Sequence, residues 1–316
     1  MHFSKFSAIA SVLLLSACGG SGSSESGSPT PIAPVAPAPS TLTLRVSDAP
    51  IDSAVAVVVE FDSVELVGDG DPLTFTVEDT AGTARQIDLL AFQGEDFATL
   101  LSDIEVEPGT YGQLRLNVTS NSYIELDNGT FDLRVPSGQL KLDGFTISES
   151  QQALYTIEFD LRKSLVDAPG QSDIILKPRG VRVVENDSVG TVNGTVDESL
   201  ITSEACADKV NLDVGNAVYV YEGLDFAIEN LGDDADEPAD INEVSPFTIG
   251  EVSLNSNGAY VFEIAYLPAG DYTLGFTCLA ENDLPESDEG SDDGFTIQNM
   301  QPVNIQATQT TTVAFE

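Results

Sequence analysis

Short runs of alternating apolar and polar residues occupy the chain from residue 41 to residue 185. β-branched side chains are frequent in them, which is typical of strands with one buried face. Turn signals such as Asp69-Gly70 and Pro108-Gly109 separate the runs. The pattern predicts an all-β sandwich. Its nine predicted strands are TLTLRV, AVAVVVEF, LTFTV, GQLRLNV, YIEL, FDLRV, LKLDGFTI, ALYTIEFDL and DIILKPRGVRVV.

Two local features interrupt this alternation. Residues 95–103 read EDFATLLSD and place Phe97, Leu100 and Leu101 at helical spacing, which predicts one short helix. The tripeptide Asp-Ala-Pro occurs at 48–50 and again at 167–169, each time after a strand or an apolar run. Both copies are predicted to be turns rather than sites.

Alternation continues from residue 190 to the end in seven further runs. The basic residues change abruptly between the two regions: ten lie within 41–185, whereas Lys209 is the single one within 190–316. This shift predicts a domain boundary, with one antiparallel β-sandwich over 41–186 and a second, acidic one over 187–316. The predicted strands of the second domain are TVNGTV, AVYVYEGL, FTIGEVSL, AYVFEIAYL, DYTLGFTCL, FTIQNMQPVNIQ and TTTVAFE.

Near the start of the chain, Lys5 precedes an apolar run from Ala8 to Leu15, which ends in Leu15-Ser16-Ala17-Cys18. The run is too short to span a bilayer, which takes roughly 20 apolar residues. Its end resembles the lipobox of bacterial lipoproteins, in which the cysteine is lipidated and becomes the mature N-terminus. This resemblance implies a signal peptide over 1–17, lipidation of Cys18 and an anchor in the outer membrane. An ordinary signal peptide with a chance cysteine is the alternative.

A flexible linker is predicted over 18–40. The segment is first rich in Gly and Ser and then in Pro, and neither composition can bury a core. The Pro-rich part favours an extended polyproline conformation of roughly 35–40 Å. We expect it to hold the folded part away from a membrane surface.

Composition excludes several kinds of chemistry. The single histidine, His2, lies in the predicted signal peptide, so the mature chain cannot build a Ser-His-Asp triad or a histidine-ligated zinc site. The formal net charge of −40 repels the phosphates of nucleic acids, so no nucleic-acid partner is expected. The acidity itself fits either solubility or an attraction for cations.

Three cysteines are present, and Cys18 is expected to carry lipid. Cys206 and Cys278 remain as an even pair in an oxidising compartment, so a disulfide between them is predicted.

Acidic residues gather in two stretches of the second domain, 233–240 and 281–293, here called the acidic loops. Clustered carboxylates suit a hard cation such as Ca²⁺, although the glycine of an EF-hand is missing. Weak Ca²⁺ binding and a purely solvated surface are the two interpretations, and no other cofactor is expected. The candidate ligands are Asp234, Asp236, Asp240, Asp288, Asp292 and Asp293.

An enzymatic alternative rests on paired carboxylates, as in glycoside hydrolases. Glu158, Asp160 and Asp143 have the required residue type, but they alternate with apolar residues and are predicted to lie on wet strand faces. The chain also has no tryptophan to stack on a sugar. A non-enzymatic role is therefore expected. A Lys–Asn cross-link in the second domain is not expected either, because it would need a buried lysine and Lys209, the sole lysine of that domain, lies in a predicted loop.

Two resemblances to known families complete this picture. The stretch LRVSDAPIDSAVAVVVEFDSVEL at 44–66 resembles the opening of a bacterial family, domain of unknown function 4382. Similar matches occur at 108–118, 135–147 and 157–184. The resemblance implies an envelope lipoprotein and brings no established activity or site.

The stretch NGAYVFEIAYLPAGDYTLGFTC at 257–278 resembles carboxypeptidase-regulatory-like and prealbumin-like modules. Tyr260, Pro268, Gly270 and Tyr272 carry this likeness, which implies an immunoglobulin-like fold rather than a chemistry. Together the observations predict a lipid-anchored protein on the periplasmic or cell-surface side of the outer membrane. Its expected partners are the membrane and an envelope or extracellular ligand.

Overall fold

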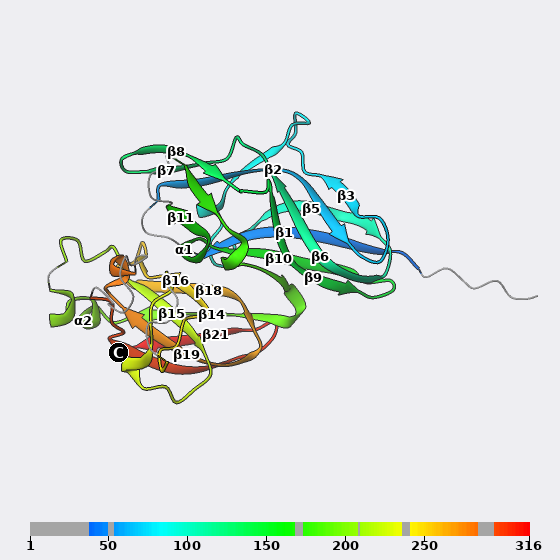
Figure 1. Cartoon of the computed structure of the whole chain (residues 1–316). Helices are drawn as coiled ribbons and strands as arrows, with labels where there is room; N and C mark the ends of the chain where they lie inside the picture. Colours follow the sequence, from blue (N-terminus) through cyan, green and yellow to red (C-terminus); the bar gives the residue numbers. More distant parts are fainter. Residues whose placement is uncertain (1–37, 50–53, 168–172, 208, 236–240, 284–293) are drawn as a thin grey trace, which may run out of the picture. The chain divides into compact units, whose positions relative to one another are not determined.

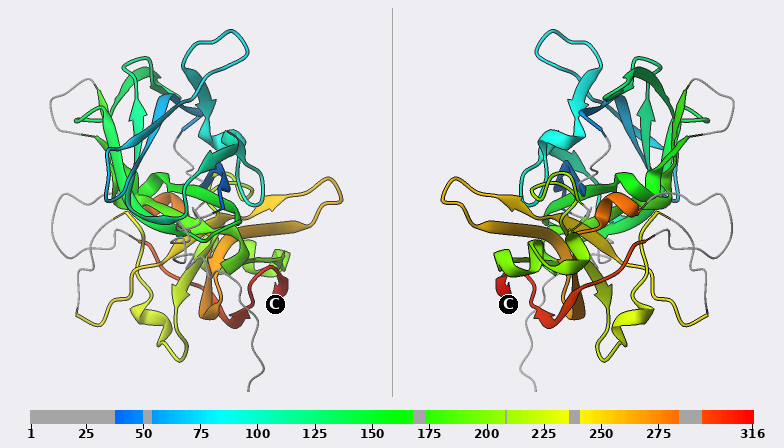
Figure 2. Two further views of the ribbon diagram at one scale, coloured as in Figure 1. Left: turned by 90° about the vertical axis from the view of Figure 1, so that its right-hand side faces the viewer. Right: turned by 90° about the vertical axis from the view of Figure 1, so that its left-hand side faces the viewer.

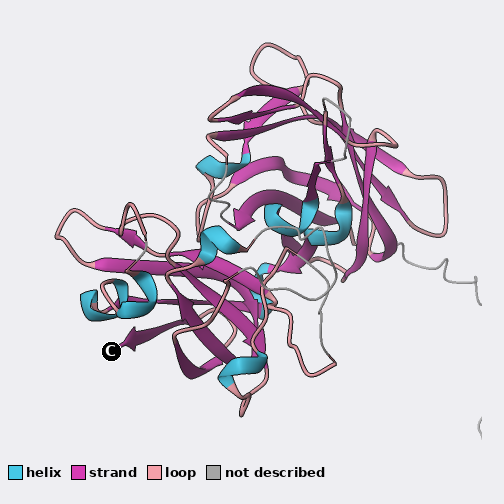
Figure 3. Cartoon of the chain, turned by 60° about the vertical axis from the view of Figure 1, so that its left-hand side comes forward, coloured by secondary structure: helices cyan, strands magenta, loops and turns pink. Residues whose placement is uncertain are grey.

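Strands dominate the computed structural model of the chain, as Figure 3 shows in magenta. The structure describes residues 38–49, 54–167, 173–207, 209–235, 241–283 and 294–316. None of the helices in these ranges is long and apolar enough to cross a membrane. The all-β prediction is confirmed.

The first thirteen strands form two sheets (Figure 1). One sheet has the order β13-β10-β1-β5. The other has the order β11-β12-β8-β7-β2-β6-β9, with β3 and β4 also paired to β2. We call these strands the N-terminal lobe. The bounds are β1 Ser40–Ala49, β2 Ala56–Val67, β3 Leu73–Thr76, β4 Arg85–Asp88, β5 Ala98–Val106, β6 Gly109–Val118, β7 Tyr123–Leu126, β8 Gly129–Arg134, β9 Gln139–Ile147, β10 Gln152–Asp160, β11 Leu165–Asp167, β12 Ile174–Leu176 and β13 Val181–Glu185.

The last eight strands form two further sheets, with the orders β17-β18-β14-β21 and β16-β15-β19-β20. We call them the C-terminal lobe, and Figure 2 shows from two sides how they group apart from β1–β13. Residues 37–316 nevertheless make one compact unit. The bounds are β14 Val189–Val196, β15 Ala217–Glu222, β16 Thr248–Glu251, β17 Ser253–Leu254, β18 Tyr260–Pro268, β19 Gly270–Thr277, β20 Asn299–Ile305 and β21 Thr310–Phe315.

Each lobe has a core between its two sheets. In the N-terminal lobe, Phe61 of β2 meets Phe159 of β10 edge to face, with ring centroids 6.4 Å apart. In the C-terminal lobe, Phe276 of β19 meets Phe315 of β21 at 6.0 Å. All four rings are fully buried, so each pair joins the two layers of a sandwich. Most strand pairs are antiparallel, but β1 with β10, β8 with β12 and β14 with β21 are parallel.

The predicted helix at 95–103 is wrong, because this stretch enters β5. β5 pairs with β1, and the register shifts twice opposite Leu44. Such bulges break the strict alternation of a strand, so that Leu100 and Leu101 are both buried although they are adjacent. Phe97 is not a core residue but lies under the guanidinium of Arg45, 3.6 Å from the ring centroid. The apparent helical period arose from this irregular strand.

The predicted strand count was low in two ways. β4, β5 and β11 were not predicted, and the run at 173–184 is divided into β12 and β13 by the short helix η2 (Pro178–Gly180). The run FTIGEVSL is divided too: β16 pairs with β15 in one sheet, whereas β17 pairs with β18 in the other. A chain that changes sheets keeps its alternation, so the pattern alone cannot show the break.

Candidate functional site at the junction of the lobes

The end of β10 starts a short segment that carries the basic residues of the site. Asp160 ends β10 and caps α1 (Leu161–Ser164): its carboxylate accepts a hydrogen bond of 3.3 Å from the N–H of Lys163. η2 packs against this turn at Gly180, where a Cβ would lie only 2.5 Å from the carbonyl oxygen of Asp160. Glycine at this position therefore lets Arg179 and Arg182 approach α1.

Two of the cations on this segment reach the C-terminal lobe from α1. Arg162 donates to the carbonyl oxygens of Ala280 and Asp283, at 3.2 and 3.3 Å, and lies 3.6 Å from the Asp283 carboxylate. Lys163 donates to the carbonyl oxygen of Pro246 at 2.9 Å and forms an ion pair with Asp234. Both cations are thus held by groups that lie far along the chain.

Two more cations reach across from η2 and β13. Arg179 donates to the carbonyl oxygen of Ala235 at 3.2 Å. Arg182 donates to the carbonyl oxygen of Tyr266 at 2.9 Å, and its guanidinium lies 4.2 Å from the centre of the Phe247 ring. Four of the ten basic side chains of the N-terminal lobe therefore bind the acidic C-terminal lobe, and we call this contact the interlobe junction.

Asp283 organises the far side of the junction. Its buried carboxylate accepts hydrogen bonds from the Tyr219 hydroxyl at 2.6 Å and from the N–H groups of Asp234 and Ala235, at 3.3 and 2.8 Å. Burial raises the pKa of Tyr219 well above its usual value, so the phenol remains a donor. The described stems of both acidic loops are joined through this one carboxylate.

Glu158 and Asp160 lie beneath the junction, so the prediction of a wet strand face for them is wrong. Both are buried, and Glu158 forms an ion pair with Arg182. Burial raises the pKa of Glu158 from 4.5 to about 7, against the opposing effect of Arg182. Asp143, the third candidate of the enzymatic alternative, is exposed on β9 in the other sheet.

Asp48 was predicted to lie in a turn, but it is a buried residue of β1. Neither oxygen of its carboxyl has a hydrogen-bond partner among the described residues. Burial, followed by the charges of Asp160 and Glu158, raises the pKa of Asp48 well above its usual value. Burial therefore favours the neutral form of this carboxyl group. The second Asp-Ala-Pro copy falls largely outside the described residues.

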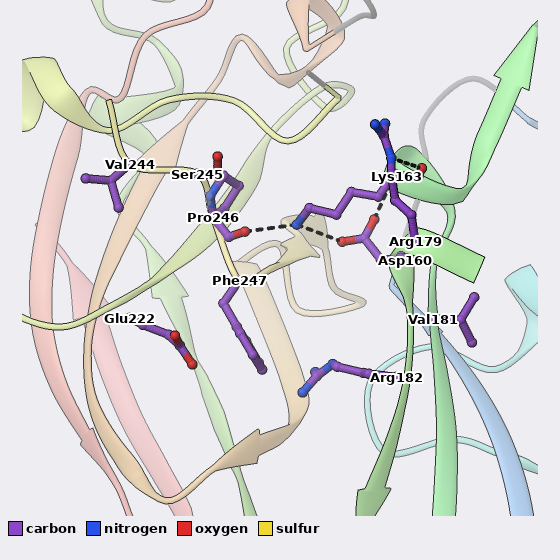
Figure 4. Close-up of a pocket in the computed structure, with 11 residues that line it drawn as sticks. Asp160, Lys163, Arg179, Val181, Arg182, Glu222, Val244, Ser245, Pro246 and Phe247 are labelled. Carbon is purple, nitrogen blue, oxygen red and sulfur yellow. Dashed lines mark hydrogen bonds and ion pairs between the residues drawn. The ribbon is translucent and has the colours of Figure 1, made fainter. Parts of the chain in front are cut away.

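A cleft of about 430 Å³ opens at the junction. Figure 4 shows Lys163 extending toward Pro246 and Asp160, with Arg182 beside Phe247 below. Glu222 of β15 faces the same space. Because these cations are already engaged with acceptors of the protein, the cleft is best described as part of the junction.

The sequence candidates fall in different places. The disulfide between Cys206 and Cys278 is confirmed, with the two Cα atoms 6.0 Å apart. Asp234 is buried against Lys163 instead of extending into solvent. No three or more Cys, Asp or Glu side chains within the described ranges are arranged to hold a metal ion. The remaining candidates lie outside the described residues: Cys18, Asp236, Asp240, Asp288, Asp292 and Asp293.

Sequence reasoning missed the junction itself. Its one visible signal was the grouping of Arg162, Lys163, Arg179 and Arg182 within a short segment of a chain that is otherwise poor in basic residues. A pattern of this kind shows that cations gather, but it does not show which acceptors they meet.

These features define a two-lobed, all-β protein whose lobes meet through buried charges. Residues 39–178 match the family model described as "Domain of unknown function (DUF4382)", in agreement with the resemblance found in the sequence. No curated protein matches the chain.

Several solved structures are distantly similar. The TIE protein of Bacillus anthracis is 13% identical over 88% of this chain and 34% of its own, with a TM-score of 0.19. The minor pilin GBS52 of Streptococcus agalactiae is 12% identical over 87% and 94%, with a TM-score of 0.18. BcpA, the major pilin subunit of Bacillus cereus, is 12% identical over 88% and 99%, with a TM-score of 0.20. Scores of this size carry no argument about the function of this chain.

Proposed function

We propose that this protein is a non-enzymatic lipoprotein of the bacterial outer membrane that binds an envelope or extracellular ligand, or supports envelope structure. The observation that carries the proposal is the interlobe junction. Four cations are committed there to acceptors of the other lobe, an arrangement that holds two sandwiches as one body. A rigid head on a tether suits a binding or structural role.

The tether supports the anchored location. Cys18 ends a lipobox-like run, and the Gly-, Ser- and Pro-rich residues after it lead into β1. In this proposal the lipid holds the chain at the membrane and the linker sets its distance from it. The negative charge of the chain would keep the head off anionic lipid surfaces.

Calorimetry of the full chain tests the junction. We expect the two lobes of the wild-type protein to unfold in one transition, because buried contacts couple them. Arg182→Ala removes the ion pair to Glu158 and the contacts to Tyr266 and Phe247, and should separate the transition into two. Arg115→Ala is the matched control, since Arg115 pairs with Glu65 inside the N-terminal lobe. Two transitions in the wild-type protein would contradict the single-body proposal.

Cell fractionation tests the anchor. Cys18→Ala should move the protein out of the membrane fraction, whereas Ser21→Ala in the linker should leave it there. Detergent partitioning of Cys18→Ala like that of the wild-type protein would show that no lipid is attached at this residue. Protease treatment of intact cells then distinguishes the cell-surface side from the periplasmic side.

Weak Ca²⁺ binding by the acidic loops is a second candidate. The observation that favours it is the hydrogen bonding of Asp283 to the N–H groups of Asp234 and Ala235, which joins the described stems of both loops. Carboxylates that start from adjoining stems repel one another, and a divalent cation would relieve that repulsion.

A further inference from the structure

Lys163, Asp234 and Asp160 form a buried triad at the interlobe junction. The Lys163 ammonium contacts the Asp234 carboxylate and lies 3.4 Å from a carboxylate oxygen of Asp160. The Asp234 side chain is fully buried, and the Asp160 side chain is 11% exposed. Lys163 and Asp160 belong to the N-terminal lobe, whereas Asp234 comes from the C-terminal lobe. The triad therefore brings an amine and a carboxyl group together across the junction.

The charges of this triad do not balance. Two carboxyl groups share one ammonium, and a buried carboxylate without a counter-charge is costly, so one of the two retains a proton. Asp234 is the deeper group, and besides Lys163 no described residue bonds to its carboxyl oxygens. Burial and the charge of Asp160 raise the pKa of Asp234 well above its usual value. Burial thus favours the neutral form of Asp234, while Asp160 accepts hydrogen bonds from both the backbone N–H and the ammonium of Lys163.

We propose that Lys163 and Asp234 condense to an intramolecular isopeptide bond that joins the two lobes covalently, with Asp160 as the proton carrier. A neutral carboxylic acid is electrophilic at its carbonyl carbon, as a carboxylate is not. The acceptor for the proton that must leave the lysine is in direct contact with it. The reaction needs an amine, a neutral acid and a base in a dry site, and these are the three groups of the triad.

The step balances without an oxidant or a cofactor. The Lys163 ammonium gives a proton to the Asp160 carboxylate, and the free Nζ lone pair attacks Cγ of Asp234. In the tetrahedral intermediate, Asp160 returns its proton to the leaving hydroxyl and accepts the second N–H proton. One C–N bond forms, one C–O bond breaks and one water leaves. Asp160 finally releases the extra proton to solvent through the cleft that it lines.

The surrounding structure holds the reacting atoms in place. Asp160 caps the turn that carries Lys163, so the base and the amine share one rigid segment. The carbonyl oxygen of Pro246 accepts a hydrogen bond of 2.9 Å from Nζ and orients it, as Figure 4 shows. Burial lowers the pKa of Lys163 and the two carboxylates raise it, with a net rise, so proton transfer to Asp160 has to precede the attack. Fixed proximity compensates for this slow step.

The bond can be detected directly by mass spectrometry of the full wild-type chain. The protein is purified from membranes, reduced and alkylated, and digested with trypsin and then with a protease that cuts at acidic residues. We expect a branched peptide in which Lys163 is joined to Asp234, lighter by one water than its two parts. Trypsin should cut after Lys209 and not after Lys163. Separate peptides, with cleavage after Lys163, would overturn the proposal.

Variants distinguish a covalent bond between Lys163 and Asp234 from a non-covalent contact between them. Asp234→Ala should abolish the branched peptide. Asp234→Asn should restore the same product, because an amide can lose ammonia where the acid loses water. Asp160→Asn keeps the lysine and Asp234 but removes the proton carrier, and should leave the peptides unlinked. A branched peptide of unchanged yield in Asp160→Asn would overturn the role of Asp160. Asp143→Asn, an exposed change of the same type, is the control.

Discussion

Glu158 makes the stability of this protein depend on pH in a direction opposite to that of a typical surface acid. Its pKa is about 7 in the folded chain, against 4.5 without burial. The folded state therefore binds this proton more tightly than the unfolded state does. The resulting stabilisation is fully present below about pH 4.5 and is lost as the pH rises through about 7.

The size of the effect follows from the displacement of the pKa. A displacement of the pKa by one unit corresponds to about 1.4 kcal/mol, so the rise of the Glu158 pKa from 4.5 to about 7 amounts to about 3 kcal/mol. Glu158 is fully buried, so salt screens this contribution little. Near it lie Arg182, Asp160 and Lys163 from its own lobe and Tyr266 from the other. The Arg182 ion pair reduces the displacement but does not cancel the cost of burial.

Glu158→Gln isolates this contribution, because glutamine retains the neutral shape and cannot ionise. Between about pH 5 and about pH 8, the free energy of unfolding of the variant should rise by about 2.5 kcal/mol relative to that of the wild-type protein, which is most of the full displacement. Urea denaturation followed by circular dichroism measures both proteins at each pH, with equal slopes as the check on two-state unfolding. The repulsion among the many other acids contributes equally to both free energies of unfolding, so it cancels when one is subtracted from the other.

Two controls accompany this measurement. Asp143→Asn makes the same change of net charge at an exposed position of β9 and should track the wild-type protein at every pH. High salt weakens surface repulsion and should leave the Glu158→Gln difference in place. A difference that stays constant with pH would refute the reasoning that burial controls the Glu158 proton. A difference that falls with rising pH would show that the ion pair to Arg182 dominates.

Three further predictions concern the C-terminal lobe. Replacing Cys206 and Cys278 together by alanine should lower the free energy of unfolding by about 4 kcal/mol, since the bridge closes a loop with a sequence separation of 72. Unchanged urea midpoints would refute this. Tyr219→Phe should cost about 1.5–3 kcal/mol, because it removes a buried donor to Asp283. Tyr260→Phe, at a more exposed hydroxyl, should cost less, and equal losses would count against the importance of burial. Millimolar Ca²⁺ should raise the melting temperature more than NaCl of equal ionic strength, following RT ln(1 + [L]/Kd). The rise should shrink in the triple variant Asp288→Asn, Asp292→Asn and Asp293→Asn, whereas equal responses to both salts would mean that the acids only solubilise the chain.

The pattern of neighbouring residues in the sequence determined much of the architecture of this protein. Alternating side chains predicted the strands and the all-β class, because a strand with one buried face repeats every second residue. The same reasoning failed at β5, where a bulge places Leu100 and Leu101 on the buried side together. The number of cysteines and the expected compartment were sufficient to predict the disulfide between Cys206 and Cys278, because two free thiols in an oxidising compartment generally form a disulfide.

Only the tertiary structure decided which charged residues are buried. Glu158 and Asp160 alternate with core residues in β10, and alternation correctly places them on the face away from that core. Whether such a face meets water or a second lobe depends on contacts between distant parts of the chain. Here the C-terminal lobe covers it, so the carboxylates are buried and their proton affinities change. Lys163 and Asp234 likewise meet through the packing of two lobes, and no local pattern encodes a contact between residues so far apart.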